Sequence, residues 1–177
     1  MSESVPPHIL FLCTGNACRS QMAEGLLKRL AGDRYRISSA GVMPAGFVHE
    51  LAIEAVHRVG GDLGGQHSKH VSDLFVKEDE APDLIVCLCK HARKKLRKLR
   101  LPPVPVLEWH LPDPINARGN KDERMTAFRW ACDHICIRLE DAIDGDQFEK
   151  AIAEGKQSKS LPGRIGRLLG SLFPQSS

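Results

Sequence analysis

The stretch His8-Ile-Leu-Phe-Leu-Cys-Thr-Gly-Asn-Ala-Cys-Arg-Ser20 decides the fold, because it predicts a strand, a short loop and the start of a helix. Residues 8–12 form a continuous apolar run between two prolines and a polar loop, which is typical of a buried parallel strand. From Ser20 to Ala31 the apolar residues recur at helical spacing, and Gly32 follows. The segment therefore predicts a helix that begins directly after the loop.

The rest of the chain continues this alternation. Further strands are predicted at residues 35–39, 83–89 and 104–107, and helices at residues 48–59, 91–100 and 121–143. Such alternation indicates parallel strands joined by right-handed crossovers, with helices on both faces. We predict an α/β fold over residues 1–143: a flavodoxin-like, doubly wound sheet of four parallel strands.

Residues 144–177 form a predicted helical extension of unassigned role. We expect a short helix at residues 146–154 and a linker at residues 155–160, where small and polar residues gather. Residues 161–173 are richer in apolar side chains. This last segment either packs on the domain and frays at its end, or contacts a partner or a membrane surface.

Length and composition exclude several classes of protein. A chain of 177 residues with 42% hydrophobic and 27% charged residues is ordinary for one globular domain, not for a disordered, collagenous or coiled-coil protein. A net charge of +3 does not demand a nucleic acid. We expect no membrane span and no signal peptide, and therefore a cytoplasmic protein. There, six cysteines indicate redox, nucleophilic or metal chemistry instead of structural disulfides.

The loop after the first strand carries the clearest chemical signal. Cys13 ends the strand, and Arg19 follows six positions later, where the helix begins. A loop of this length can curl so that its backbone N–H groups surround a tetrahedral oxyanion, while the arginine grips two oxygens. We expect Gly15 to permit a turn that a Cβ would resist. In the predicted site Cys13 is the nucleophile, and the positive field of the helix start and the arginine stabilises it as a thiolate. The predicted oxyanion cradle consists of Thr14, Gly15, Asn16, Ala17, Cys18, Arg19 and Ser20.

Such a cradle supports two reactions. The thiolate can attack the phosphorus of a phosphate ester, which requires a general acid, or the arsenic of arsenate, which requires a second thiol to collapse the adduct and release arsenite. Asp113, between two prolines beyond the fourth strand, is the candidate acid, and Cys89, closing the third strand, is the candidate second thiol. Both are expected on the rim that carries Cys13. The alternatives are an Asp-Pro turn and a buried structural cysteine.

Other cysteines and charges have weaker signals. Cys132 and Cys136 lie four apart on a helix, but His134 points to another face, so core packing is favoured over a metal site. Cys87 is expected to be a buried neighbour of Cys89, and a direct bridge between them would require the strand to unravel. Seven Lys or Arg residues lie between Lys90 and Arg100. They form either a solvated helix face, or a surface that steers an oxyanion or docks an acidic redox partner.

The loop and several other segments of the sequence resemble a known family. Phe11-Leu-Cys-Thr-Gly-Asn-Ala-Cys-Arg-Ser-Gln-Met-Ala-Glu-Gly25 resembles the thiol-dependent arsenate reductases, which share a fold with the low-molecular-weight protein tyrosine phosphatases. The resemblance covers residues 8–143. Gln21, where the phosphatases usually have proline, and Ile115-Asn116, where they usually have tyrosines, favour the reductases. Further matching segments are Ser38-Ser-Ala-Gly41, Gln66-His-Ser-Lys69, Val86-Cys-Leu-Cys89 and Trp109-His-Leu-Pro-Asp-Pro114.

The resemblance implies a role for each site residue, and it also shows that one expected cysteine is absent from this chain. It implies that Cys13 attacks arsenate, that Asp113 assists the departing oxygen, and that Cys89 then resolves the adduct. Reductases that use thioredoxin carry a further cysteine seven residues after the second one, but here that residue is Leu96. We expect no tightly bound cofactor. The reductant is then an external thiol, such as glutathione, mycothiol or a thioredoxin- or glutaredoxin-type protein, or else Cys87 or Cys18 substitutes.

A potassium site and the reaction itself are the last two predictions from the sequence. Some members of the family bind potassium near the loop, and the matching positions all carry side-chain oxygen, namely Asn16, Glu24, Ser39 and Asp73. The main prediction is reduction of arsenate to arsenite, acting on a small tetrahedral oxyanion and on no nucleic acid. The alternatives are a phosphatase that hydrolyses phosphate monoesters, and a non-catalytic sensor of oxyanions or redox state.

Overall fold

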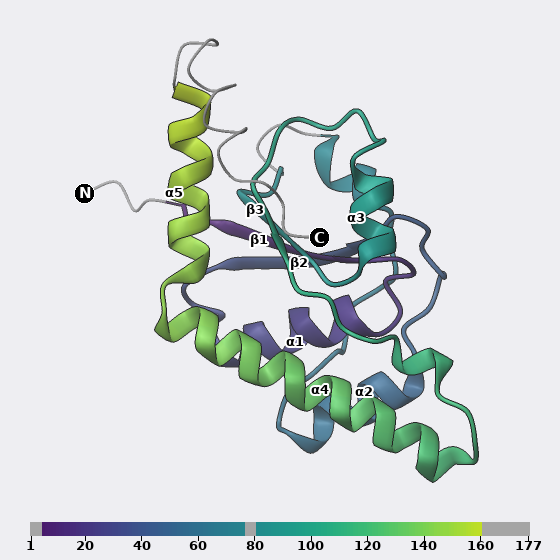
Figure 1. Cartoon of the computed structure of the whole chain (residues 1–177). Helices are drawn as coiled ribbons and strands as arrows, with labels where there is room; N and C mark the ends of the chain where they lie inside the picture. The colour runs from purple at the N-terminus through teal and green to yellow at the C-terminus, as the bar shows by residue number, and fades with distance from the viewer. Residues whose placement is uncertain (1–4, 77–80, 161–177) are drawn as a thin grey trace.

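One parallel sheet forms the centre of the molecule. A computed structural model describes residues 5–76 and 81–160, and Figure 1 shows the whole chain. Four strands pair in the order β2-β1-β3-β4. The order confirms the predicted flavodoxin-like sheet, with its switch point between the carboxyl ends of β1 and β3. The strands are β1 (His8–Cys13), β2 (Arg36–Gly41), β3 (Leu84–Cys87) and β4 (Val106–Glu108).

Helices cover both faces of this sheet, as predicted. Helix α1 packs on β1 and β2, and α4 packs across α1 and α2. Helix α3 lies on the other side, against β1 and β3 (Figure 1). Two short 3-10 helices, η1 (Val71–Phe75) and η3 (Pro114–Asn116), lie in the connections. The α-helices are α1 (Arg19–Ala31), α2 (Glu50–Arg58), α3 (Lys90–Leu96), α4 (Lys121–Asp144) and α5 (Gln147–Ser160).

The apolar patterns explain why these elements form. Strand β1 is buried along its whole length, because it is central in the sheet and both of its faces are covered. Helix α4 begins with a capping box between Asn120 and Glu123, which satisfies two backbone N–H groups at its start. Its predicted apolar face is buried, namely Phe128, Ala131, Cys132, Ile135, Leu139 and Ala142.

Some boundaries differ from the predicted ones. Strand β3 ends at Cys87, two residues early, because Cys89 serves as the N-cap of α3 and its sulfur accepts the N–H of Ala92. Helix α3 ends at Leu96 and not at residue 100. Its like charges four residues apart are unfavourable in a helix, and they account for the early end.

The C-terminal extension is helical where a linker was predicted. Helix α5 continues through residues 155–160, so the linker prediction is wrong. Tertiary packing anchors the helix: Phe148 is fully buried, and its ring meets Tyr35 edge-on at 5.7 Å between centroids. Gly155 permits the close approach of Pro105, since a Cβ there would lie 2.7 Å from the proline ring. The predicted apolar segment at residues 161–173 lies outside the described residues. Within the described ranges, no helix has the length and apolarity that crossing a bilayer requires.

Candidate active site

The loop between β1 and α1 lies at the switch point of the sheet. Residues 14–18 connect the central strand to the helix that follows it, so the loop opens beyond the carboxyl end of β1. Neighbouring strands end beside it, since Cys13 pairs with Gly41 of β2 and Leu12 pairs with Cys87 of β3. In open α/β sheets, ligands bind at this position.

The sulfur of Cys13 is held inside this loop. Its Sγ lies 2.9 Å from Ser20 Oγ, and the backbone N–H of Asn16 donates to it at 3.2 Å. The side chain is only 3% exposed. The sulfur is thus in contact with one hydroxyl and one backbone N–H of its own loop and helix.

Asn16 shapes the loop. It adopts a left-handed backbone with φ of 49°, which asparagine tolerates better than most residues. Its side-chain Nδ2 donates to Ser20 Oγ and to Ser39 Oγ, each at 2.9 Å, while its Oδ1 accepts the N–H of Lys69 at 2.9 Å. Asn16 thus fixes the hydroxyl that contacts Cys13, and it ties the loop to β2 and to the segment before η1.

The position at which a Cβ would clash is not Gly15, as expected, but Gly41. Gly15 does not have a positive φ, and a Cβ there would meet Ala45 Cβ at an ordinary 3.6 Å. The expectation for Gly15 is therefore wrong. The tight position is Gly41, where a Cβ would lie 2.6 Å from the carbonyl oxygen of Thr14. β2 ends directly against the loop, so this position has no space for a side chain.

Several loop amides remain available to a ligand. The N–H groups of Gly15, Ala17 and Cys18 donate to no acceptor within the part of the chain that the structure describes. Successive N–H groups of this kind, at the start of a helix, form an anion-binding nest. Three N–H groups of the predicted cradle thus lack a protein acceptor, whereas that of Asn16 donates to Cys13 Sγ.

Arg19 and Asp113 meet at the rim. The Arg19 Nη2 donates to the Asp113 carboxylate at 2.6 Å, and Nη1 donates to the carbonyl oxygen of Leu111 at 2.9 Å. Arg19 is buried, with 5% exposure. The fold therefore brings the predicted acid to the predicted arginine. The Leu111 contact was not found from the sequence, because a backbone carbonyl has no residue-specific signal.

Asp113 lies at the edge of a groove. Its carboxylate also accepts the N–H of Ile115 and so caps η3. The groove has a volume of about 560 Å³. Its apolar lining is supplied mainly by Pro112, Pro114, Ala117, Ala127 and Trp130.

Cys89 reaches the same loop from the end of β3. Its Sγ lies 3.4 Å from Thr14 Oγ1, the side chain next to Cys13 in the sequence. The cysteine is 9% exposed, and its sulfur accepts the N–H of Ala92 at the start of α3. Cys89 therefore lies against the loop that follows Cys13, and Asp113 contacts the helix residue at the end of the same loop.

The other two nearby thiols are buried and inert in character. Desolvation raises the pKa of Cys87 to about 12, and its sulfur donates to the carbonyl of Cys89. Desolvation also raises the pKa of Cys18, with the charge of Asp113 adding to the effect. Both are at most 3% exposed. Neither resembles the low-pKa, accessible cysteines that exchange disulfides.

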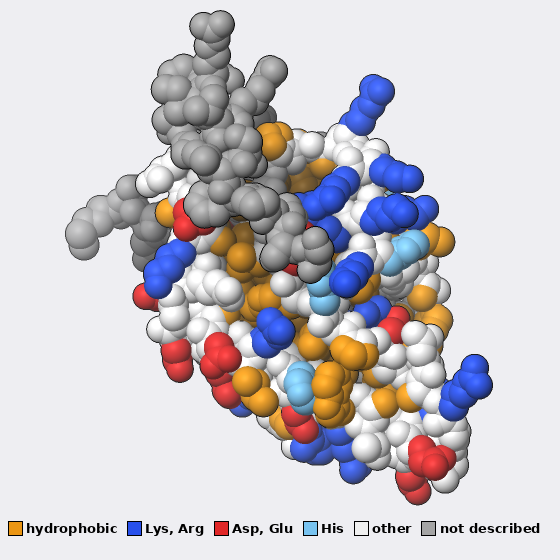
Figure 2. Space-filling view, in the orientation of Figure 1, with side chains coloured by type: hydrophobic (Ala, Val, Ile, Leu, Met, Phe, Trp, Pro, Cys, Tyr) orange, Lys and Arg blue, Asp and Glu red, His pale blue; other side chains and the backbone are white. Residues whose placement is uncertain are grey.

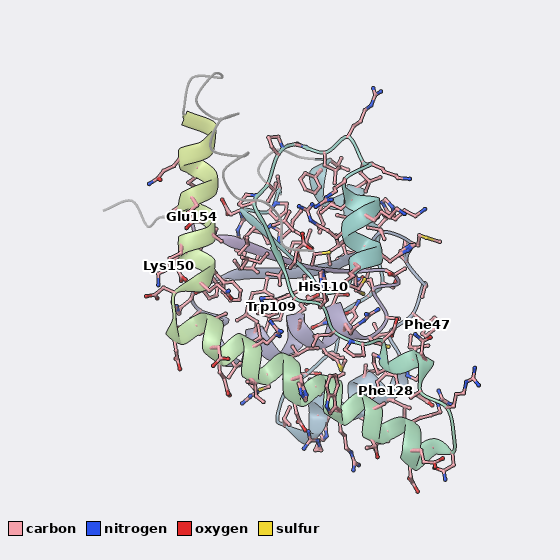
Figure 3. All side chains as sticks on the ribbon, in the orientation of Figure 1. Phe47, Trp109, His110, Phe128, Lys150 and Glu154 are labelled. Atoms are coloured by element: carbon pink, nitrogen blue, oxygen red, sulfur yellow. The ribbon has the colours of Figure 1, made fainter. Side chains whose placement is uncertain are left out.

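A second layer of residues braces the loop from outside. The segment after β2 donates from Met43 to Thr14 O at 2.9 Å, from Ala45 to Gly15 O at 2.8 Å, and from His49 to Ala17 O at 2.9 Å. Figure 3 shows Phe47 of this segment near Phe128 of α4. The His49 ring stacks on Phe128 at 4.7 Å between centroids. Sequence reasoning missed this brace, since its contacts are backbone hydrogen bonds.

A pair of glutamines forms another missed support. Gln21 Nε2 donates to the carbonyl of Asn16 at 3.0 Å, and Gln66 Nε2 donates to Gln21 Oε1 at 2.7 Å. Both residues lie in segments that carry the family resemblance, and that was the available signal. Together they link α1, the loop and the segment before η1.

The predicted potassium ligands do not form a convincing cation site. Asn16, Glu24 and Ser39 are buried, but Asp73 is exposed and its carboxylate accepts the N–H of His70. Glu24 Oε2 is buried without a hydrogen bond in the described residues, yet Glu24 Oε1 already pairs with Lys28 at 2.6 Å. A single free carboxylate oxygen is too few for a hard cation.

A second ammonium group also faces Glu24. Burial lowers the pKa of Lys69, and the negative charge of Glu24 opposes that shift. The carboxylate is thus paired with Lys28 and also lies in the field of the Lys69 ammonium, which donates to the carbonyl of His67. We derive no step through a potassium ion.

Comparison with known proteins agrees with this geometry. The sequence model of the family described as low molecular weight phosphotyrosine protein phosphatase matches residues 8–157. An arsenate reductase from Bacillus subtilis is 37% identical over 133 residues, covering 75% of this chain and 92% of that protein. A solved arsenate reductase in a phosphate-binding state superposes with a TM-score of 0.60 at 27% identity, covering 78% of this chain and 98% of the other.

A further solved structure shares this fold. A thioredoxin-dependent arsenate reductase from Corynebacterium glutamicum superposes with a TM-score of 0.60 at 25% identity, covering 82% of this chain and 64% of that one. The family match, the curated relative and the shared fold agree. This chain belongs to the low molecular weight phosphotyrosine protein phosphatase family.

Proposed function

We propose that this protein reduces arsenate to arsenite, with Cys13 as the nucleophile and Cys89 as the resolving thiol. One observation carries the proposal: a second thiol, Cys89, lies 3.4 Å from the hydroxyl of Thr14, the residue next to Cys13. Hydrolysis of a phosphate ester has no use for this thiol. The relatives named arsenate reductase support the same conclusion.

The first step binds and attacks the oxyanion. The free amides of Gly15, Ala17 and Cys18 and the guanidinium of Arg19 receive the arsenate oxygens. The Cys13 thiolate forms a bond to arsenic, and one hydroxyl oxygen of arsenate leaves as water, its second proton coming from another arsenate hydroxyl directly or through Asp113. Ser20 and the Asn16 N–H hold the sulfur for this attack.

The second step transfers two electrons. The Cys89 sulfur attacks Cys13 Sγ, forming a Cys13–Cys89 disulfide and breaking the sulfur–arsenic bond. The electron pair of that bond passes to arsenic, which leaves as arsenite and takes up the proton of the second thiol. Thr14 contacts Cys89 and lies next to Cys13, so it positions the two sulfurs for this step.

An external thiol completes the cycle in this proposal. Cys18 and Cys87 are buried thiols with raised pKa, and Leu96 stands at the position of the third relay cysteine. The disulfide is therefore reduced from outside the chain. A cytoplasmic location is part of the proposal, and it is supported by the six cysteines, all of which are unpaired.

A second candidate function is hydrolysis of aryl phosphates. The groove beside Asp113, with Trp130 in its lining, could seat an aromatic leaving group next to the acid. In that reaction Cys13 forms a cysteinyl-phosphate that water then hydrolyses. Cys89 takes no part.

One experiment separates the two reactions. Reduced enzyme is mixed with arsenate in the absence of added thiol, and arsenite is counted per chain. We expect about one arsenite per wild-type chain and none from Cys89→Ser, while Cys13→Ser loses every activity. Hydrolysis of p-nitrophenyl phosphate by Cys89→Ser serves as the folding control. Equal arsenite release from Cys89→Ser, or hydrolysis without any arsenite from the wild type, would overturn the proposal.

A further inference from the structure

A strongly basic surface begins directly after Cys89. Helix α3 starts at Lys90, and the exposed cations of residues 90–100 form what we call the basic ridge. Figure 2 shows Lys and Arg side chains gathered over this part of the molecule. The ridge consists of Lys90, Lys94, Lys95, Arg97, Lys98 and Arg100.

Within the part of the chain that the structure describes, most of this charge has no acidic partner. Arg93, which is not part of the ridge, pairs with Glu108 at 2.7 Å, and the second oxygen of Glu108 lies 3.1 Å from His110. Within residues 5–76 and 81–160, no carboxylate pairs with Lys90, Lys94, Lys95, Lys98 or Arg100. Like charges four residues apart weaken a helix. The repulsion within the ridge therefore disfavours helix α3, so a contribution to folding stability does not explain the ridge.

The chemistry of the site requires an electron source at this place. After one turnover of the proposed reaction, Cys13 and Cys89 form a disulfide. The neighbouring thiols Cys18 and Cys87 are buried, and Leu96 in α3 is also buried. Cys89 is the more exposed of the two reacting cysteines, at 9% against 3% for Cys13. An external thiol therefore approaches Cys89, at the start of the ridge.

The extent of the ridge fits a protein better than a small thiol. The seven residues of α3 alone span about 10 Å, and the ridge continues beyond the helix. A tripeptide-sized thiol has one or two carboxylates and would meet only one or two of these cations. An acidic protein surface can meet several of them at once, and such complementarity raises association rates.

We infer that the basic ridge is the docking surface of an acidic dithiol protein of the thioredoxin class that reduces the Cys13–Cys89 disulfide. The inference rests on the proposed function. One thiolate of the partner attacks Cys89 Sγ, and Cys13 leaves as a thiolate held by Ser20 and the Asn16 N–H. The partner's second thiol then attacks the mixed disulfide. Two electrons and two protons pass to the enzyme, and the partner is released as a disulfide.

The test compares reductants on a charge-reversed ridge. The variant Lys94→Glu/Lys98→Glu leaves Lys90 and Cys89 unchanged. Steady-state arsenite production is measured with an acidic thioredoxin recycled by its reductase and NADPH, with glutathione, and with dithiothreitol. At low ionic strength we expect kcat/KM for the thioredoxin to fall by at least about tenfold, with a smaller loss in high salt, where exposed charges are screened.

A matched control carries the same charge change elsewhere. Lys150→Glu/Lys156→Glu alters α5, which Figure 3 shows on the opposite side of the view from α3. We expect this control to keep wild-type kinetics with all three reductants. Release of one arsenite per chain without any reductant tests the proposed function separately, and the ridge variant should keep it.

Three outcomes would overturn the inference. Unchanged thioredoxin kinetics in the ridge variant would show that the ridge is not the docking surface. A loss of equal size with dithiothreitol, or in the single turnover, would assign the ridge to arsenate steering. Efficient turnover with glutathione that falls in the ridge variant, with none supported by thioredoxin, would assign the ridge to a small anionic thiol.

Discussion

Arg19 Nη2 lies 2.6 Å from Asp113 Oδ2, so the protein's own carboxylate binds the guanidinium that we propose receives the oxyanion. The two residues are 94 positions apart in sequence and meet because β1 and β4 end at the same rim. In the proposed reaction an entering oxyanion exchanges with Asp113 for this guanidinium. The exchange frees the carboxylate beside the oxygen that leaves.

Asp113→Asn tests this exchange. The asparagine is a weaker competitor for Arg19 than a carboxylate is, because charge-assisted hydrogen bonds are the stronger ones. We expect phosphate, measured as an inhibitor or by calorimetry, to bind about tenfold more tightly to the variant, a difference of about 1.4 kcal/mol. Without phosphate the variant should be less stable, since Arg19 is buried. Weaker phosphate binding would contradict the exchange.

The two buried thiols near the site should be dispensable. We expect Cys18→Ala and Cys87→Ala to keep arsenite release close to the wild type, because burial raises the pKa of both thiols and so disfavours their reactive form. Alkylation by iodoacetamide near neutral pH, followed by peptide mapping, should modify Cys13 or Cys89 before either of them. Loss of turnover in Cys87→Ala, with an unchanged melting temperature, would place Cys87 in the relay.

His49 should make stability depend on pH. Burial, aided by the charge of Arg124, lowers the pKa of His49 below 6.5, with Glu50 opposing. The unfolded chain therefore binds this proton more tightly, so the free energy of unfolding should fall as the pH falls below about 6.5. Protonation also removes the acceptor that His49 Nδ1 offers to Leu51 N–H at the start of α2.

The variant His49→Asn provides the check on this prediction. Asparagine is a good N-cap and does not titrate, so α2 keeps its cap. Denaturant unfolding between pH 5 and 8 should show a smaller slope for the variant than for the wild type. Identical slopes would exclude His49 as the source.

Substitution of Gly41 should destabilise the protein more than substitution of Gly15, the opposite of what the loop motif suggests. Gly41→Ala places a Cβ 2.6 Å from Thr14 O and should cost about 1–3 kcal/mol of the free energy of unfolding. Gly15→Ala meets only Ala45 Cβ at 3.6 Å and should cost less. Thermal or denaturant unfolding of the two variants decides the ranking. A larger cost at Gly15 would show that the loop needs glycine for its backbone.

Potassium should have no specific effect. Lys28 already pairs with Glu24, so the melting temperature should agree within about 1 °C in KCl and NaCl of equal concentration. In Lys28→Met/Lys69→Met the carboxylate loses its partner and the positive charge of Lys69, and an added monovalent cation should then raise the melting temperature. Selective stabilisation of the wild type by potassium would contradict this account.

The sequence alone determined the parallel sheet, and it supplied the candidate reacting groups. Residues 8–20 have a strand, a loop and a helix in consecutive positions, and these local patterns depend only on near neighbours. The rule that parallel strands end at one rim then placed Cys89 and Asp113 near Cys13. This inference needed only the order of the strands and no side-chain detail.

Only the tertiary structure decided the contacts between distant segments. It showed that Asp113 binds Arg19, that Gly41 and not Gly15 is the tight glycine, and that residues 155–160 are helical. The backbone brace from residues 43–49 was invisible as well, since a carbonyl and an N–H are the same in every residue. Such features depend on which atoms packing brings together, and the free energy of that packing is not contained in any short stretch of sequence.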